Sequence, residues 1–219
     1  MTLRRLAAME GLDFADVLAV YMLDNAFFRK AAEPMGEDVL AARYIEGHMR
    51  LKRSLGEKTV APYAVFLRRL LAEIVCFPVQ GDVVMYGDSF GAVRQRGMYT
   101  GVDLFDEQRE AGRLRVVAMA GGMVVEAAQG KGDGNYVVIE SETGARYRYA
   151  HLAYVHADIA VGVRLEAGAP IGYVGDSGAD GRSELFPVRL TVSVWVANDM
   201  PGGAAWVNPY IFLRLVENK

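Results

Sequence analysis

The chain has 219 residues, of which 52% are hydrophobic and 23% are charged, and its formal net charge is -3. This composition suits one or two domains with real cores and excludes a disordered chain. The net negative charge argues against a basic surface for nucleic acid, no run reaches the roughly 18 to 20 apolar residues that span a bilayer, and a single cysteine excludes an intramolecular disulfide.

The first third of the chain has the apolar spacing of short helices. Gly11 is placed to end the first helix, and Asp13 to cap the start of the second. Gly56 is placed to end the third, and Pro62 suits the first turn of the fourth. We therefore expect a small helical bundle as a first domain over residues 1–76, with helices over 3–9, 14–25, 37–55 and 62–75.

Glycine usage changes sharply after this region, since only four of the 24 glycines precede residue 78. From there the apolar period is two, with frequent turn signals. The segments around 137–139 and 146–150 are expected to pair antiparallel through the turn SETG (141–144). Turns at GKGDGN (130–135) and GDSGADG (175–181) are placed to border a groove. The prediction is an α+β protein whose second domain, 77–219, is a mainly antiparallel β-sandwich or half-barrel.

Several segments of this second part occur in the order of one known family. They are SFGAVRQRGMYTGVDLF (89–105), VVAMAGGMVVEA (116–127), YRYAHL (147–152), VGVRLEAGAPIGYVGDSG (161–178), VRLTVSVWV (188–196) and VNPYIF (207–212). Over about 140 residues this order resembles the lysostaphin/LytM family of zinc peptidases, which cut peptide cross-links in bacterial cell walls. The resemblance implies a LytM-like domain whose groove follows the open face of the sheet.

The same resemblance identifies the positions of a zinc site. The family supplies two ligands from His-x-x-x-Asp and one from His-x-His, whose side chains at i and i+2 share a strand face. Here Tyr99 stands at the first ligand position and Asp103 is retained, while Arg189 and Thr191 occupy the two positions of His-x-His. His151 matches the histidine of the family's Tyr-x-His segment, which is not a primary ligand.

Only one of the three expected metal donors remains, the carboxylate of Asp103. The phenol of Tyr99 would have to lose a proton with an ordinary pKa of about 10, Thr191 offers a neutral hydroxyl, and Arg189 adds a permanent positive charge. We therefore expect no bound metal and no catalytic residue, with Asp103 as a vestigial ligand and His151 and Arg189 as vestigial catalytic positions. Together these five residues are predicted to line a binding groove.

The remaining histidines have simpler interpretations. His48 lies in a helical stretch rich in charge and is expected to be solvated, and His156 is expected in a surface loop. For His151 two roles stay open, a strand residue hydrogen-bonded to Asp103 or Tyr99, and a residue that contacts a ligand. Aromatic residues near the groove also have two interpretations, as flat faces for a sugar or peptide or as ordinary packing: Tyr99, Tyr147, Tyr149 and Trp195.

Three functions follow from these patterns. The first is a non-catalytic LytM-like domain, a pseudoenzyme that binds peptidoglycan or a cell-envelope protein as a regulator or scaffold in cell-wall remodelling. The second is an active zinc-dependent peptidoglycan endopeptidase with an altered metal site. The third is a partner module in which the helical part binds and the β part is a spacer. The family implies the extracytoplasmic side of the cell envelope, so we expect a leader or membrane anchor upstream of Met1.

Overall fold

The computed structural model describes most of the chain, with several gaps. Within 37–44 and at 46 only the backbone is described. The helix expected over 3–9 lies largely outside the described residues, and so does the end of the turn expected at 175–181. No helix among the described residues combines the length and apolar character needed to cross a membrane. The described residues are 7–8, 10–24, 37–81, 84–94, 97–178, 187–196, 203 and 205–217.

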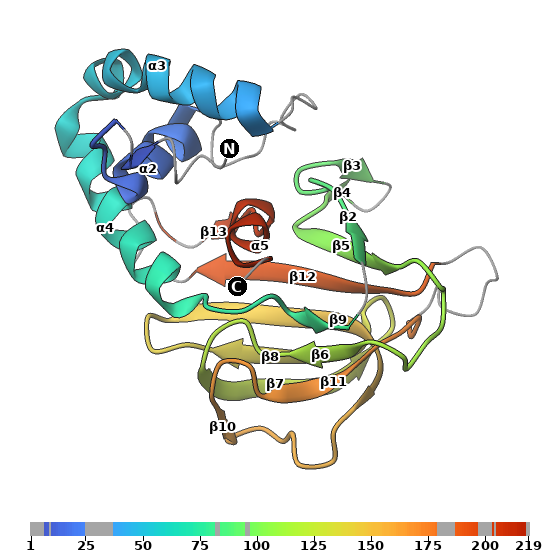
Figure 1. Ribbon diagram of the computed structural model, residues 1–219. Coiled ribbons are helices and arrows are strands. Elements are labelled where there is room, and N and C mark those ends of the chain that lie inside the picture. Colours follow the sequence, from blue (N-terminus) through green and yellow to red (C-terminus); the bar gives the residue numbers. More distant parts are fainter. Residues whose placement is uncertain are drawn as a thin grey trace.

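The helices gather on one side of a large sheet (Figure 1). Asp13 caps the first of them as expected, because its Oδ1 accepts a hydrogen bond from the Ala15 amide at 2.9 Å. The helices are α2 (Phe14–Asp24), α3 (Glu37–Leu55), α4 (Glu57–Glu73) and, near the C-terminus, α5 (Tyr210–Val216). Helices α3 and α4 are separated only by Gly56, whose φ of 85° permits a sharp change of direction.

The start of α4 differs from the prediction made from Pro62. The helix begins at Glu57, and Pro62 lies inside it. The carbonyl oxygen of Gly56 already accepts hydrogen bonds from the amides of Thr59 and Val60, at 3.0 and 3.1 Å. The glycine therefore fixes the start of the helix one turn before the proline, which is tolerated in the interior.

His48 is also placed differently from its prediction. Its side chain is only 2% exposed, and its Nε2 lies 3.1 Å from Oδ2 of Asp16 on α2. Lys52, one turn later on α3, places its Nζ 2.9 Å from the same carboxylate oxygen. The expectation of a solvated residue was wrong because the face of α3 that carries His48 and Lys52 packs against α2.

The β part forms one antiparallel sheet and a separate two-stranded ribbon, which confirms the α+β class with a mainly antiparallel sheet. The order along the main path is β1-β6-β11-β9-β12-β5-β2, with β8, β7 and β10 attached beyond β9 and β13 beside β12. The expected pairing of β8 with β9 through SETG is confirmed. The strands are β1 (Val79–Gln80), β2 (Val84–Tyr86), β5 (Gly101–Asp106), β6 (Arg115–Val117), β7 (Gly122–Gly130), β8 (Gly134–Glu140), β9 (Ala145–Val155), β10 (Arg164–Leu165), β11 (Pro170–Val174), β12 (Arg189–Val196) and β13 (Ala205–Val207), with β3 (Val93–Arg94) and β4 (Gly97–Met98) in the ribbon.

The alternation along β9 separates a core face from an outer face. Tyr147 and Tyr149 are fully buried in the core, so packing is the correct interpretation of these two aromatic residues. Arg146 and Arg148 alternate with them and are only partly covered, because successive strand residues point to opposite faces. This outer face is continuous with the outer face of β12, the neighbouring strand.

One carboxylate joins the helical part to the sheet. Glu73, the last residue of α4, accepts hydrogen bonds from Ser141 Oγ at 3.0 Å, from Thr143 Oγ1 at 2.8 Å, and from the Tyr147 hydroxyl. Burial and the nearby Glu73 carboxylate raise the pKa of the Tyr147 phenol, so the phenol remains a donor. The end of α4 is thereby fixed against the β8–β9 turn.

Candidate functional site

The pairing of β5 with β12 brings the predicted ligand positions together. Thr191 on β12 lies directly opposite Asp103 on β5, and on its other side faces Ala150 of β9. Tyr99 comes just before β5, two residues ahead of Gly101. A Cβ added to Gly101 would lie 2.6 Å from Ser193 Oγ and 2.8 Å from the Val192 carbonyl oxygen, so only glycine permits this close strand approach.

Two hydroxyls converge on one oxygen of the Asp103 carboxylate. Thr191 Oγ1 donates to Oδ1 at 2.6 Å, and the Tyr99 hydroxyl donates to the same oxygen. The two hydroxyl oxygens are 3.1 Å apart. Asp103 is only 4% exposed. Burial, followed by the charge of Asp103, raises the pKa of the Tyr99 phenol well above its ordinary value, so the phenol stays protonated and acts as a donor.

Two guanidinium groups compensate the charge of this carboxylate. Arg94 Nη2 donates to Asp103 Oδ2 at 3.0 Å, and its Cζ lies 3.4 Å from the centre of the Tyr99 ring, a cation–π contact. Arg189 Nε lies 3.7 Å from Asp103 Oδ1. The buried carboxylate therefore has protein donors at both oxygens and positive charge on two sides.

His151 joins this network through Arg189. Its Nε2 lies 3.1 Å from Arg189 Nη2, which can only donate, so Nδ1 carries the proton and donates to the Ser177 carbonyl oxygen at 2.9 Å. Burial and then the neighbouring charge of Arg189 lower the pKa of the His151 imidazole. Of the two roles left open for His151, the hydrogen bond to Asp103 or Tyr99 is not formed, because the guanidinium of Arg189 lies beside the imidazole; contact with a ligand stays a prediction.

The backbone of His151 is itself unusual. Its φ is 64°, in the left-handed region that residues other than glycine seldom adopt. The conformation is held by a hydrogen bond from its amide to the Asp133 carbonyl oxygen at 2.8 Å and by the bond from its ring to Ser177. Strain of this kind is often found where a fold fixes a functional side chain.

The donor set at this site does not fit Zn²⁺. A hydrolytic zinc site needs three strong donors and an open water position, whereas here both oxygens of Asp103 accept hydrogen bonds from Tyr99, Thr191 and Arg94. A dication would also meet the fixed charge of Arg189. Across the described parts of the chain there is no group of three or more His, Cys, Asp or Glu side chains that could hold a metal ion.

Other possible donors lie in different surroundings. Cys76 Sγ donates to the Ala118 carbonyl oxygen at 3.0 Å, and burial raises the pKa of the thiol. His156 follows β9, as expected of a loop residue, but it is half-buried, with its ring centre 5.6 Å from that of Tyr173 and 6.4 Å from that of Tyr154. Neither side chain takes part in the contacts around Asp103.

Two members of the site were not identified from the sequence. Arg94 reaches Asp103 from the short β3–β4 ribbon, and the carbonyl group of Ser177 orients the ring of His151. A strand of two residues has no periodicity to detect, and a backbone carbonyl has no sequence signal at all. The five predicted residues do lie together, but their role as a binding groove stays a prediction.

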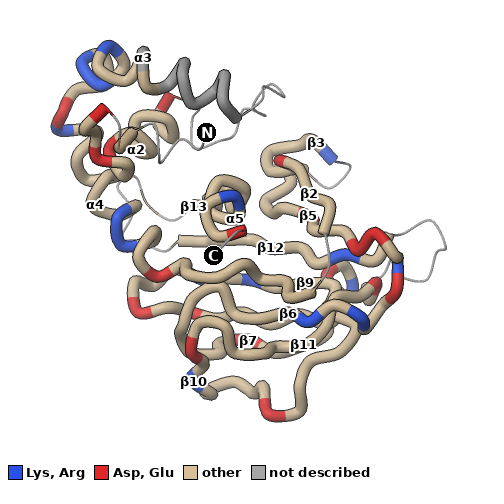
Figure 2. Tube along the Cα trace, viewed as in Figure 1, with Lys and Arg blue, Asp and Glu red and all other residues tan. Residues whose placement is uncertain are grey.

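Along the described parts of the chain, residues of one charge sign do not gather in one region. Figure 2 shows acidic and basic residues interspersed along the described helices and strands. This pattern is unlike the continuous basic stripe of a nucleic-acid-binding protein. It agrees with the net charge of -3.

Comparison with known proteins finds similarity both in sequence and in structure. Residues 97–197 match peptidase family M23. The crystal structure of a candidate glycyl-glycine endopeptidase LytM from Ruminococcus gnavus is 28% identical, with a TM-score of 0.67, and the alignment covers 94% of this chain and 83% of that chain. The catalytic domain of the antimicrobial peptidase lysostaphin from Staphylococcus simulans is 27% identical, with a TM-score of 0.44 and coverage of 63% and 92%. No match is found among curated proteins.

Proposed function

The chain belongs to the lysostaphin/LytM-type peptidases of family M23, and we propose that it is a non-catalytic member that binds peptidoglycan or a protein partner in the cell envelope. The family is usually zinc-dependent, so the proposal depends on what has replaced the zinc site. It assigns the chain a regulatory or scaffold role in cell-wall remodelling. It also assigns the chain to the extracytoplasmic side of the envelope.

One observation supports the proposal that the chain is not catalytic. The side chains at the two replaced ligand positions, Tyr99 and Thr191, donate hydrogen bonds to the one retained ligand, Asp103. The replacements therefore use the lone pairs that a metal would need. A buried carboxylate with every oxygen satisfied is a structural element, and removing it is costly.

The replacement of the remaining family histidine supports the same proposal. Arg189 cannot accept a proton from water at neutral pH, because a guanidinium stays protonated. It donates to His151 and so also occupies the nitrogen that could have served as a base. The site thus lacks both a metal position and a free general base among its described residues.

The surroundings of Asp103 also have features that suit the proposed binding. Arg94 is 45% exposed beside the buried Asp103, and Arg189 extends the positive charge toward Pro187, whose carbonyl oxygen lies 3.4 Å from its Nη1. With one carboxylate and two guanidinium groups, the site has a net positive charge. It can attract carbonyl or carboxylate oxygens of a peptide without activating water.

The proposal is tested on the purified full-length chain in three measurements. After incubation with zinc and dialysis, metal analysis should find well below one zinc per chain, and incubation with purified peptidoglycan should release no peptide ends. Co-sedimentation with peptidoglycan sacculi then tests binding directly. Near-equimolar zinc together with turnover that a chelator abolishes would overturn the proposal.

A matched pair of variants locates the binding surface. Arg94→Gln removes an exposed charge beside Asp103, and Arg69→Gln removes an equal charge from an exposed position on α4. We expect only Arg94→Gln to weaken co-sedimentation. Equal effects of the two variants would mean that net charge, and not the groove, governs the interaction.

A further inference from the structure

A second polar site lies on the same sheet face as Asp103, farther along β12. Thr191, Ser193 and Trp195 alternate along this strand and so share one face. Across the strand pair, Ser193 faces Arg148 and Trp195 faces Arg146. Trp195 also faces Trp206 on β13. The outer face thus continues from the closed Asp103 site into a region with two indole rings and two guanidinium groups.

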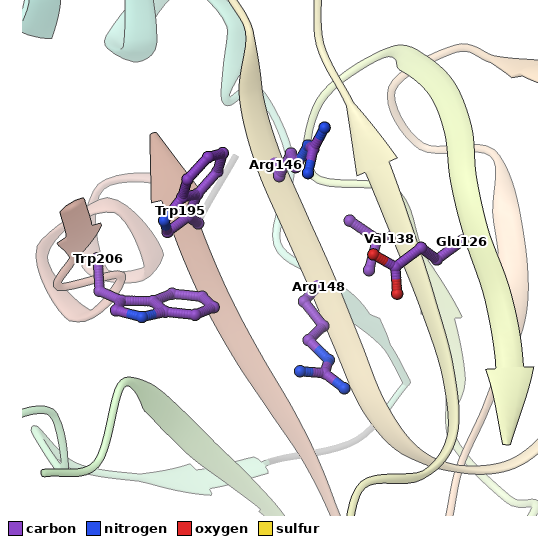
Figure 3. A pocket seen from close by; sticks show the side chains of 6 residues that line it. All are labelled: Glu126, Val138, Arg146, Arg148, Trp195 and Trp206. Atoms are coloured by element: carbon purple, nitrogen blue, oxygen red, sulfur yellow. The ribbon is translucent and has the colours of Figure 1, made fainter. Parts of the chain in front are cut away.

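These side chains surround a pocket with a volume of about 190 Å³. Figure 3 shows the two indoles on one side, Glu126 and Val138 on the other, and the arginines between them. Val138, 6% exposed, contributes an apolar surface. The volume is below the roughly 300–1,000 Å³ of a site for a whole drug-sized ligand, so it suits one ring-sized unit of a longer molecule. The lining residues are Glu126, Val138, Arg146, Arg148, Trp195 and Trp206.

The arginines are held in place but keep donors to spare. Arg146 pairs through Nε with Glu140 at 2.6 Å, and Arg148 pairs through Nη2 with Asp133 at 2.6 Å. The Cζ of Arg146 lies 5.3 Å from the centre of the Trp195 ring. Arg148 Nε is buried and has no hydrogen-bond partner among the described residues. The side chains of Arg146 and Arg148 are 43% and 28% exposed, so the outer nitrogens of their guanidinium groups can donate to a ligand oxygen in the pocket.

The pocket also offers an acceptor. Glu126 Oε2 accepts a hydrogen bond from the Tyr136 hydroxyl at 3.1 Å, which holds the carboxylate at the pocket and leaves its other oxygen for a ligand. Three carboxylates, of Glu126, Glu140 and Asp133, stand against the two guanidinium groups. The pocket therefore has no surplus of positive charge that would select an anion.

We propose that this pocket binds one pyranose ring of a neutral glycan chain. A sugar ring has apolar C–H faces, which can pack on the indoles of Trp195 and Trp206, and hydroxyls at its edge, which both accept and donate. The guanidinium groups of Arg146 and Arg148 and the carboxylate of Glu126 provide the matching donors and acceptor. The inference deepens the proposed binding function by naming the sugar part of the ligand, and it rests on that function only in placing the chain at a cell wall.

The chain supplies its own probe for this pocket. It has two tryptophans, and both line the pocket, so tryptophan fluorescence reports on this place alone. The full-length chain is titrated with chitotriose and, separately, with cellotriose. We expect a saturable change in emission with at least one of these sugars, and a dissociation constant on the order of 1 mM or tighter.

Variants then separate a sugar site from a general effect. Trp206→Leu keeps Trp195 as reporter and should weaken binding about tenfold or more, and Arg148→Gln should weaken it in the same direction. Arg164→Gln is the control, because it breaks an exposed pair with Glu142 at 3.2 Å on β10, away from the pocket. Circular dichroism checks that each variant is folded.

Two outcomes would overturn the sugar site. One is the absence of a saturable change with both sugars, or a change that Trp206→Leu and Arg148→Gln leave intact. The other is a saturable response to triglutamate at equal or lower concentration, since this would make the pocket a carboxylate site. Zinc content and peptidoglycan hydrolysis are measured on the same preparation, so a failure of the non-catalytic proposal is seen separately from a failure of this one.

Discussion

The polar groups at the two ends of the outer face of β12 differ in whether protein partners satisfy them. Around Asp103, each carboxylate oxygen accepts hydrogen bonds from protein donors, and the donors come from three separate segments. Around Trp195, the arginines are anchored by carboxylates, yet the buried Arg148 Nε has no acceptor among the described residues, and the two arginines line an open pocket. The polar groups at the Asp103 end (the closed end) are satisfied by neighbouring side chains, whereas the Trp195 end (the open end) has an open pocket that can hold a ligand.

This difference shows that one sheet face can satisfy its polar groups internally at one end and leave them accessible at the other. At the Asp103 end, hydroxyl and guanidinium groups donate to the carboxylate and form an internal network. Such a network, once complete, stabilises the structure. At the Trp195 end the same strand register places Trp195 opposite Arg146 and Trp206, and these side chains border a pocket. Each of the following predictions tests one side of this contrast.

The largest effect is expected from removing the carboxylate of the closed end. Asp103→Ala removes the acceptor shared by the Tyr99 and Thr191 hydroxyls and the negative charge beside Arg94 and Arg189, so it should lower the free energy of unfolding by about 3–5 kcal/mol. Urea denaturation measures this. Asp103→Asn, which keeps the shape and the acceptor oxygen, should cost less. A loss under about 1 kcal/mol for Asp103→Ala would mean that the network contributes little.

The second prediction concerns a variant with zinc ligands added beside Asp103. Tyr99→His with Thr191→His should give zinc affinity at tens of micromolar or tighter, because the backbone places these positions beside Asp103. Zinc at a hundredfold excess over the dissociation constant would then stabilise the variant by about 2.7 kcal/mol. Calorimetric titration is the measurement, with the unchanged chain as control.

The residue at position 189 should determine how tightly the variant binds zinc and whether it hydrolyses peptide bonds. Adding Arg189→His to the double variant should tighten zinc binding, since it removes a positive charge beside Asp103, and only this triple variant should hydrolyse peptide bonds. A folded double variant that binds no zinc would mean that Arg94 and the neighbouring strands have remodelled the site beyond what the ligands can restore.

The third prediction concerns pH. Burial and Arg189 lower the pKa of His151 in the folded chain, against the hydrogen bond to Ser177 and the charges of Asp103 and Asp133. The unfolded value is about 6.5, so below that pH the unfolded chain binds more protons. Stability from His151 is complete above about pH 6.5 and is lost as pH falls through the folded pKa.

A variant isolates this contribution from those of the other histidines. His151→Asn is suitable because asparagine tolerates a positive φ better than most residues. The pH dependence of its urea midpoint should be flatter between pH 6.5 and 5 than that of the unchanged chain. Equal slopes would indicate that His151 titrates alike in the folded and unfolded states.

The smallest effect is expected at the open end. Arg146→Gln breaks the pair with Glu140, but the two side chains are 43% and 37% exposed, so the free energy of unfolding should fall by about 0–1 kcal/mol. Urea denaturation beside Asp103→Ala gives the comparison directly. If Arg146→Gln cost as much as Asp103→Ala, the open end would be a structural network like the closed one.

The sequence predicted the elements whose signals are local. The cap at Asp13, the bounds of α3 and the β8–β9 hairpin follow from side chains and turns within a few residues. The close approach of Asp103 and Thr191 was also predicted, because the family's motifs fix which strand positions face one another. The start of α4 was missed since Gly56, and not Pro62, sets the first hydrogen bonds of that helix.

Only the tertiary structure decided which partners these residues have. Burial of His48 against Asp16, the bond of His151 to Arg189, and the reach of Arg94 to Asp103 join segments that are distant in sequence or lack any period. The meeting of Trp195 with Trp206 likewise depends on strand register. Residue types and spacing determined the fold class and which side chains occupy the positions around Asp103. Hydrogen bonds and burial between distant segments determined which end of the sheet face is closed and which is open.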